Sequence, residues 1–164
     1  GGYTNTSLPT ILGLPEEFES NVTYDLTLSV EAYPEQTSES AQGGFRLLIS
    51  NGFVEIQNQS RVQFLDDGWT HTESGNQYRS WNLTWTAPSD NTTTVDFVLH
   101  GNAVNGNGNS EGDMWNSFGT VLPGAQYEGP VEQLDLTNEL DDTQYGILYG
   151  GLFALLLFLY FAVK

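Results

Sequence analysis

An uncharged stretch of 18 residues near the C-terminus constrains this chain more than any other feature. Residues 146–163, GILYGGLFALLLFLYFAV, carry no charged side chain, and Lys164 follows them. A helix of this length spans roughly 27 Å, close to the roughly 30 Å hydrocarbon core of a bilayer. A buried core helix is the alternative, but a helix that is apolar on every side favours contact with lipid. We therefore predict a transmembrane helix over residues 145–164.

The charges on either side of this helix predict how it lies in the membrane. Five acidic residues precede it within 131–144, and a lysine follows it. Positive charge marks the cytoplasmic end of a membrane helix. We therefore expect a single-pass protein of the cell membrane, with an extracellular domain over 1–130, an acidic juxtamembrane stalk over 131–144 and a cytoplasmic C-terminus. Export requires a signal peptide, which we expect to be removed before Gly1.

Small residues form one stripe on the predicted helix. Gly146, Gly150 and Ala154 recur every four residues and therefore lie on the same face. Small side chains let a second helix approach closely, so the stripe predicts contact with another membrane-protein subunit or self-association with a second copy. The alternative is that Gly and Ala are simply common in membrane helices.

Alternation of apolar and polar residues dominates the rest of the chain. Apolar side chains occupy every second position from Val22 to Ala32, which is typical of a strand with one buried face. The same pattern recurs over residues 80–87 and 95–99. Short strands separated by Gly, Asn, Pro and Ser predict an all-β fold, an antiparallel immunoglobulin-like β-sandwich followed by a single C-terminal transmembrane α-helix.

Two details of this sandwich follow from local pattern. Trp81 and Trp85 fall on the apolar side of their strand, so we expect both in the core. Asn51-Gly52 stands between two apolar runs, residues 45–50 and 53–56. Because Asn-Gly is the favoured pair for a type I′ turn, it predicts a hairpin at this point.

The charge balance and the absence of cysteine exclude several functions. The chain has 21 acidic and 4 basic residues and a formal net charge of −17, so it lacks the clustered cations that nucleic acid binding needs. Without cysteine it forms no disulfide, no thiolate zinc site and no covalent c-type haem. Strong acidity is typical of proteins that work in salt, with an ordinary acidic surface protein as the alternative. Where it coincides with the N-linked glycans and the domain type that the next motifs predict, an archaeal source is expected.

Asn-x-Ser/Thr sequences predict N-linked glycans at five positions: Asn5, Asn21, Asn58, Asn82 and Asn91. Chance would give roughly two in a chain with this content of Asn, Ser and Thr. None of the five lies on a predicted core face, and an attached sugar must be in water. The alternative is a set of Asn- and Thr-rich loops that carry no glycan.

The order of several motifs carries a family resemblance. The most specific are Trp81-Asn-Leu-Thr-Trp-Thr-Ala-Pro88 and Gly101-Asn-Ala-Val-Asn-Gly-Asn107, and others include Gly2-Tyr3-Thr4, Gly43-Gly-Phe-Arg-Leu47 and Thr70-His71-Thr72. Over residues 1–125 the chain resembles the Reeler-type domain, in particular the prokaryotic form called choice-of-anchor V. The resemblance implies an extracellular immunoglobulin-like sandwich with a varied anchor and no established catalytic activity. Many relatives carry a Cys-x-x-Cys-His that suggests haem, but this chain has no cysteine.

The polar loop over 101–113 is a candidate metal site. Its alternate positions hold oxygen ligands of the kind that calcium prefers: Asn107, Asn109, Glu111 and Asp113. The position of the bidentate glutamate in a calcium loop holds Phe118 instead. Calcium binding is therefore one hypothesis, and a turn that uses Asn and Gly for positive φ is the other.

The chain's two histidines and its methionine form a second candidate site. His71, His100 and Met114 would suit copper if they converged. The spacing does not show that they do, and a hydrogen-bonded structural role for His71 is the alternative. The sequence has no nucleophile elbow and no His-rich zinc motif, so we predict no enzymatic activity.

Together these features predict a membrane-anchored cell-surface glycoprotein. Its expected role is that of a structural or accessory subunit of a larger membrane assembly, or of an adhesive surface module. The alternative is an extracellular module that binds a ligand or a metal, calcium before copper. No other cofactor is expected.

Overall fold

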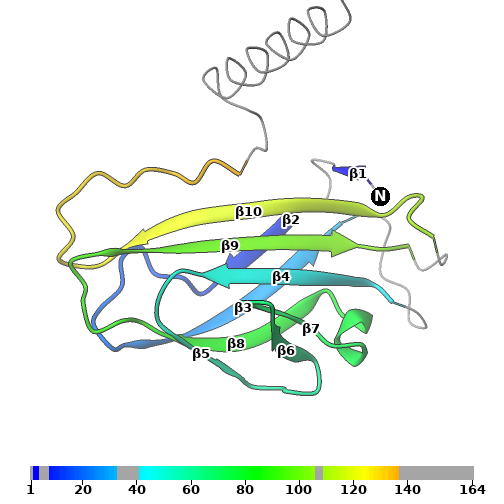
Figure 1. Cartoon of the computed structure of the whole chain (residues 1–164), viewed down its shortest axis with the longest axis horizontal. Helices are drawn as coiled ribbons and strands as arrows, with labels where there is room; N and C mark the ends of the chain where they lie inside the picture. The colour runs from blue at the N-terminus through cyan, green and yellow to red at the C-terminus, as the bar shows by residue number, and fades with distance from the viewer. Residues whose placement is uncertain (1, 4–7, 33–40, 106–108, 137–164) are drawn as a thin grey trace, which may run out of the picture.

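The computed structural model describes residues 2–3, 8–32, 41–105 and 109–136, which form ten strands and one 3₁₀-helix (Figure 1). The strands are β1 (Gly2–Tyr3), β2 (Leu8–Leu12), β3 (Thr23–Glu31), β4 (Gly43–Ile49), β5 (Phe53–Ile56), β6 (Val62–Leu65), β7 (Gly68–His71), β8 (Ser80–Thr86), β9 (Thr94–Ala103) and β10 (Met114–Pro123). The 3₁₀-helix spans Ser74–Gln77.

The predicted membrane anchor falls outside this part of the chain. No helix within the described ranges is long and apolar enough to cross a membrane. The predicted transmembrane helix over 145–164, with its stripe of Gly146, Gly150 and Ala154, lies beyond the described residues.

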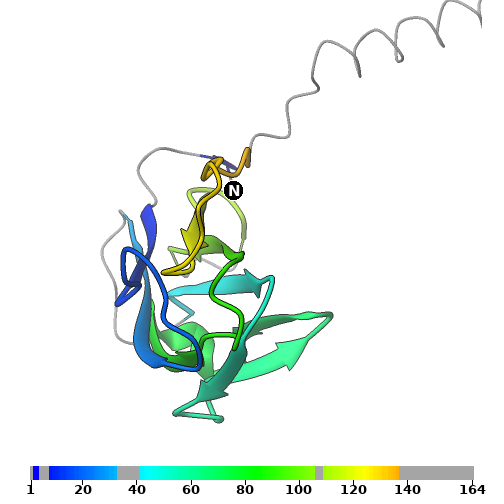
Figure 2. The same cartoon turned by 90° about the vertical axis from the view of Figure 1, so that its left-hand side faces the viewer.

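The strands form two sheets that pack face to face. One sheet has the order β1-β10-β9-β4-β7-β6 and the other the order β2-β3-β8-β5. In Figure 2 the blue strands β2 and β3 lie to one side of the yellow β10 and the cyan β4. Neighbouring strands are antiparallel, except that β1 runs parallel to β10. The predicted all-β sandwich is therefore confirmed.

Alternation along the strands builds the core between the sheets. In β3, β8 and β9 every second side chain is buried, as the sequence pattern predicts: Leu26, Leu28, Val30, Trp81, Leu83, Trp85, Val95, Phe97 and Leu99. Trp85 is fully buried, and its ring lies edge-on to Phe97 with centroids 5.0 Å apart. Because Trp85 belongs to the four-stranded sheet and Phe97 to the six-stranded one, this pair joins the two layers.

The prediction of a hairpin at Asn51-Gly52 is wrong. β4 pairs with β9 along its whole length and with β7 on its other side, so it offers no free edge to β5. The chain instead crosses to the other sheet, where β5 pairs with β8. Gly52 has φ +99°, and the Trp85 indole Nε1 donates to the Asn51 carbonyl at 3.0 Å. Asn51-Gly52, although a pair favoured in hairpin turns, thus forms a corner between the two sheets.

A type I′ hairpin does occur, between β6 and β7. Leu65 pairs with Gly68, and the two residues between them, Asp66 and Asp67, have φ +47° and +59°. Positive φ at both central positions defines this turn, and Asp is one of the few residues with a side chain that tolerates it. The Arg46 guanidinium donates to the carbonyls of Leu65 and Asp66 and so fastens the turn to the six-stranded sheet.

Residues 131–136, the first part of the predicted acidic stalk, run back over β10 with no helix or strand of their own (Figure 1). Leu134 and Leu136 are half-buried, whereas Asp135 between them is exposed. A Cβ added at Gly119 of β10 would lie 2.7 Å from Leu136 Cδ1, so Leu136 sits directly over this glycine. The described part of the stalk is therefore packed on the domain.

Candidate functional site

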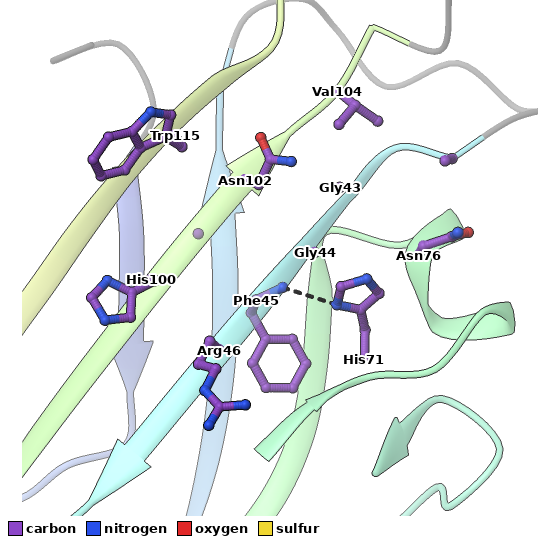
Figure 3. Close-up of a pocket in the computed structure, with 12 residues that line it drawn as sticks. Gly43, Gly44, Phe45, Arg46, His71, Asn76, His100, Asn102, Val104 and Trp115 are labelled. Atoms are coloured by element: carbon purple, nitrogen blue, oxygen red, sulfur yellow. Dashed lines mark hydrogen bonds between the residues drawn. The ribbon is translucent and has the colours of Figure 1, made fainter. Parts of the chain in front are cut away.

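The described residues form a groove of about 400 Å³ on the outer face of the six-stranded sheet (Figure 3). We call it the sheet-face groove and define it by six residues that line it: Gly44, Arg46, His71, His100, Asn102 and Trp115. None of the described residues that line it is Asp or Glu. That absence sets the groove apart in a chain with 21 acidic residues.

Strand register places these residues in two rows. Trp115, Asn102 and Gly44 lie opposite one another on β10, β9 and β4. His100 is in register with Arg46, in the next row. Since alternate residues of β9 fill the core, His100 and Asn102 face outward, and both are exposed.

Gly44 forms the floor of the groove, and its missing side chain decides where His71 lies. A Cβ at Gly44 would overlap the His71 ring, with Nδ1 2.7 Å away and Cε1 closer still. The Phe45 backbone N–H donates to His71 Nδ1 at 3.3 Å. An Nδ1 that accepts a hydrogen bond leaves the proton of a neutral imidazole on Nε2. His71 is therefore held as a hydrogen-bond donor at one wall.

His100 and Arg46 lie together in the second row. His100 Nδ1 is 2.7 Å from the Ser117 hydroxyl on β10. Partial desolvation and the Arg46 guanidinium lower the pKa of His100 below its ordinary value of 6.5. Both effects disfavour the imidazolium form of His100.

Trp115 supplies the apolar surface of the groove. Its side chain is 41% exposed, although it belongs to a paired strand and is large enough to bury. Beside it on β9 stands the exposed amide of Asn102 (Figure 3). An exposed indole next to an amide, an imidazole and a guanidinium can bind a ligand that has both an apolar face and polar groups.

The predicted copper set does not assemble in the described structure. His71 and His100 do line the same groove, but each Nδ1 already has a hydrogen-bond partner. Met114 precedes Trp115 in β10 and pairs with the buried Ala103, so it lies on the opposite face of the sheet. No group of three or more His, Cys, Asp and Glu that could hold a metal occurs in the described part of the chain.

The predicted calcium loop is only partly described, because Asn107 lies outside the described residues. Asn109 Oδ1 accepts the Glu111 backbone N–H at 2.7 Å, and Asp113 Oδ1 accepts the Asn105 backbone N–H at 3.2 Å. Two oxygens expected to face calcium thus serve the loop's own backbone, as in the turn alternative. Calcium binding stays a prediction.

The five predicted glycan acceptors differ in exposure. Asn21, Asn58 and Asn82 are exposed, as expected, and Asn5 lies outside the described residues. Asn91 does not match the expectation: it is 8% exposed, and its Nδ2 donates to Glu19 Oε2 at 3.4 Å. Since a glycan is attached at that nitrogen, Asn91 is poorly placed to accept one.

Comparison with solved structures shows which fold this is. The Reelin-N domain of F-spondin aligns with a TM-score of 0.51 and 21% identity, over 75% of this chain and 88% of that one. Two structures of the human F-spondin reeler domain give a TM-score of 0.50 and 21% identity, over 75% of this chain and 94% or 91% of theirs. The domain has a Reeler-like fold.

This likeness concerns the fold alone, since a fold does not fix a function. No protein-family model matches the sequence, and no curated protein gives a significant match. The choice-of-anchor V form of the resemblance stays a prediction.

Sequence reasoning found only part of the groove. It singled out His71 and His100 as rare side chains, but it named Gly44 and Asn102 only within family motifs and missed Trp115, so it assigned none of these three to a shared groove. These three come from separate strands that are adjacent only in the sheet. A possible signal was Trp115, a bulky apolar residue directly after a polar loop.

Proposed function

We propose that this chain is a membrane-anchored cell-surface glycoprotein whose Reeler-like domain acts as an adhesive recognition module. The sheet-face groove is its binding surface. The observation that carries the proposal is the groove itself. There an exposed tryptophan meets polar side chains from three strands and from the 3₁₀-helix, with no carboxylate among the described lining residues. The apolar segment 146–163 and the exposed sequons support a position outside the cell.

Binding suits the groove better than catalysis. His100 and Ser117 are close enough for a base and a nucleophile. In a Ser-His-Asp triad a carboxylate stabilises the imidazolium that forms, whereas His100 has the Arg46 guanidinium beside it. The cation opposes the charge that the reaction would create, so we assign the pair no catalytic role.

The test is adhesion to the cell envelope. Beads that carry the full chain should retain envelope fragments from the source cells, and the double variant Asn102→Ala/Trp115→Ala should not. Phe53→Ala is the matched control, because Phe53 is 67% exposed and does not line the sheet-face groove. Equal retention by the double variant, or no retention by the unaltered chain, would reject the proposal.

A second role rests on the sequence of the apolar segment. The stripe of Gly146, Gly150 and Ala154 suits contact with another helix, as an accessory subunit of a membrane assembly would need. Gly150→Ile keeps the segment apolar but places a branched side chain in the stripe. Membrane insertion should persist, and co-purification of other subunits in mild detergent should be lost. Unchanged co-purification would contradict the role as an accessory subunit, and adhesion would be the remaining proposed role.

A further inference from the structure

We propose that the sheet-face groove binds a neutral saccharide, with a sugar ring against Trp115 and its hydroxyl groups bonded to Asn102 and His71. This inference rests on the proposed adhesive function and names the chemical class of its ligand. Three properties of the groove support it: its charge, its hydrogen-bonding groups and its length.

The charge of the groove argues against an anionic ligand. His71 accepts a hydrogen bond at Nδ1, as a neutral imidazole does, and desolvation and Arg46 disfavour the charged form of His100. Arg46 is the one cation among the described lining residues, and its two terminal nitrogens donate to the carbonyls of the β6–β7 turn. Asp66 and Asp67 form that turn, so the segment that holds Arg46 carries two negative charges of its own. With a net charge of −17, the chain as a whole repels anions.

The charge also argues against a cationic ligand. A buried or half-buried cation needs a carboxylate partner, and no described residue that lines the groove supplies one. A ligand without charge meets neither penalty. The groove therefore favours a ligand that is neutral and polar.

The hydrogen-bonding groups suit hydroxyls in particular. A hydroxyl both donates and accepts, so its site needs donors and acceptors together. The groove has both: Nε2–H of His71 donates, and the side-chain amides of Asn76 and Asn102 do either. A sugar ring also has an apolar face of C–H groups, which the 41% exposed indole of Trp115 can cover.

The spacing of the strands sets the length of the ligand. Trp115 and Gly44 lie in one row on β10 and β4, with β9 between them. Two strand spacings make about 10 Å, and His71 stands beyond Gly44 at the far wall (Figure 3). A ligand that touches both Trp115 and His71 must therefore bridge this gap, and a short oligosaccharide has the length to do so.

The test uses an array of short neutral oligosaccharides beside carboxylated and sulfated ones. The full chain is made in a host that adds no glycans, and is purified in a detergent without a sugar headgroup, so that neither competes. We expect binding to neutral oligosaccharides. Trp115→Ala should weaken it about tenfold or more, and Trp115→Phe should weaken it less because an aromatic face remains.

Two further variants keep this test specific. Gly44→Ala should also weaken binding, since the new Cβ displaces His71. Phe53→Ala, an exposed aromatic outside the groove, should leave the affinity unchanged. The melting temperature of each variant is measured, and a variant that melts early is replaced by Asn102→Ala, whose side chain is exposed.

The outcomes are distinct. The saccharide proposal fails if no neutral oligosaccharide binds, if only charged ones bind, or if Trp115→Ala binds as the unaltered chain does. Envelope adhesion that depends on Asn102 and Trp115 would then keep the adhesive function with another ligand. If the unaltered chain also retains no envelope fragments, both the saccharide proposal and the adhesive function are rejected.

Discussion

Arg79 is a single side chain on which both sheets depend. It is 9% exposed and precedes β8, and its guanidinium donates to three backbone carbonyls. These are Ala32 at the end of β3, Gln42 before β4 and Val104 after β9, at 3.0, 2.8 and 3.2 Å. β3 belongs to one sheet, and β4 and β9 to the other. Burial lowers the pKa of the guanidinium, but arginine keeps its proton.

We expect Arg79→Lys to cost about 3 kcal/mol of unfolding free energy. The single ammonium group of lysine cannot reach three carbonyls spread over a guanidinium fork, and buried carbonyls without a donor are costly. Urea unfolding of the full chain measures the loss. Arg61→Lys is the matched control, because Arg61 lies over the Tyr78 ring at 3.7 Å and should cost only about 0.5–1 kcal/mol. Equal losses would contradict the role of Arg79 as a tie.

His100 gives the domain a pH dependence of known sign. Its pKa in the folded chain is below 6.5, whereas the unfolded chain has the ordinary value. Between these values the unfolded state binds a proton that the folded state does not, so stability falls as pH falls through this window. NMR titration of the imidazole should give a pKa below 6.5.

The matched variant is His100→Gln. Lowering the pH from about 7.5 to about 5 should reduce its melting temperature less than that of the unaltered chain, because it has no proton to take up. The carboxylates of the chain contribute equally to the pH dependence of both proteins, so the difference in melting temperature reports His100 alone. Parallel pH curves would show that the folded environment does not shift its pKa.

Among elements, the corner at Gly52 is a tightly constrained connection. At φ +99° a side chain is strained, and an added Cβ would lie 2.7 Å from the Thr86 carbonyl oxygen. We expect Gly52→Ala to cost about 2 kcal/mol or more. Asn51→Ala removes only the hydrogen bond to the Gly52 N–H and should cost about 1 kcal/mol or less. Chemical denaturation compares the two, and a smaller loss for Gly52→Ala would contradict the strain.

The elements also show what pattern can predict. The strands with one buried face, β3, β8 and β9, were predictable because burial of one face imposes period two. Pairing was not, since the Asn-Gly preference is local, whereas a hairpin also needs a free strand edge. β4 has neighbours on both sides, and the type I′ turn falls at Asp66-Asp67 instead.

At the scale of the whole molecule, exposure divides the glycan acceptors. We expect hexose-containing additions at Asn21, Asn58 and Asn82 and none at Asn91, whose amide is buried against Glu19. Mass spectrometry of glycopeptides from the native host tests this. A glycan at Asn91 would show that it is attached before this loop folds. A fully unmodified chain would reject the glycoprotein prediction.

The candidate site was predictable only in part, because strand pairing brings its residues together and sequence spacing does not show that pairing. Rarity drew attention to His71 and His100, which do face one groove. The partners of His100 could not be read from spacing, because Arg46 and Ser117 stand beside it through strand pairing. Asn91 shows the opposite error: it is a polar loop residue that was expected to be exposed, but it is buried and donates to a side chain 72 positions away.

The seat of Leu136 over Gly119 has a mechanical consequence. A pull on the chain after residue 136 would first peel residues 131–136 from β10, which lengthens the tether without unfolding the domain. The load would then reach residues 124–126, which donate backbone hydrogen bonds to Thr93, Phe18 and Asn91, and only after them β10, whose ladder with β9 runs over the full strand. The groove residues Trp115, His100 and Asn102 stand on these same two strands. In the proposed membrane-anchored protein, tension between a bound ligand and the membrane would therefore first be taken up by residues 131–136, while the core between the two sheets stays intact.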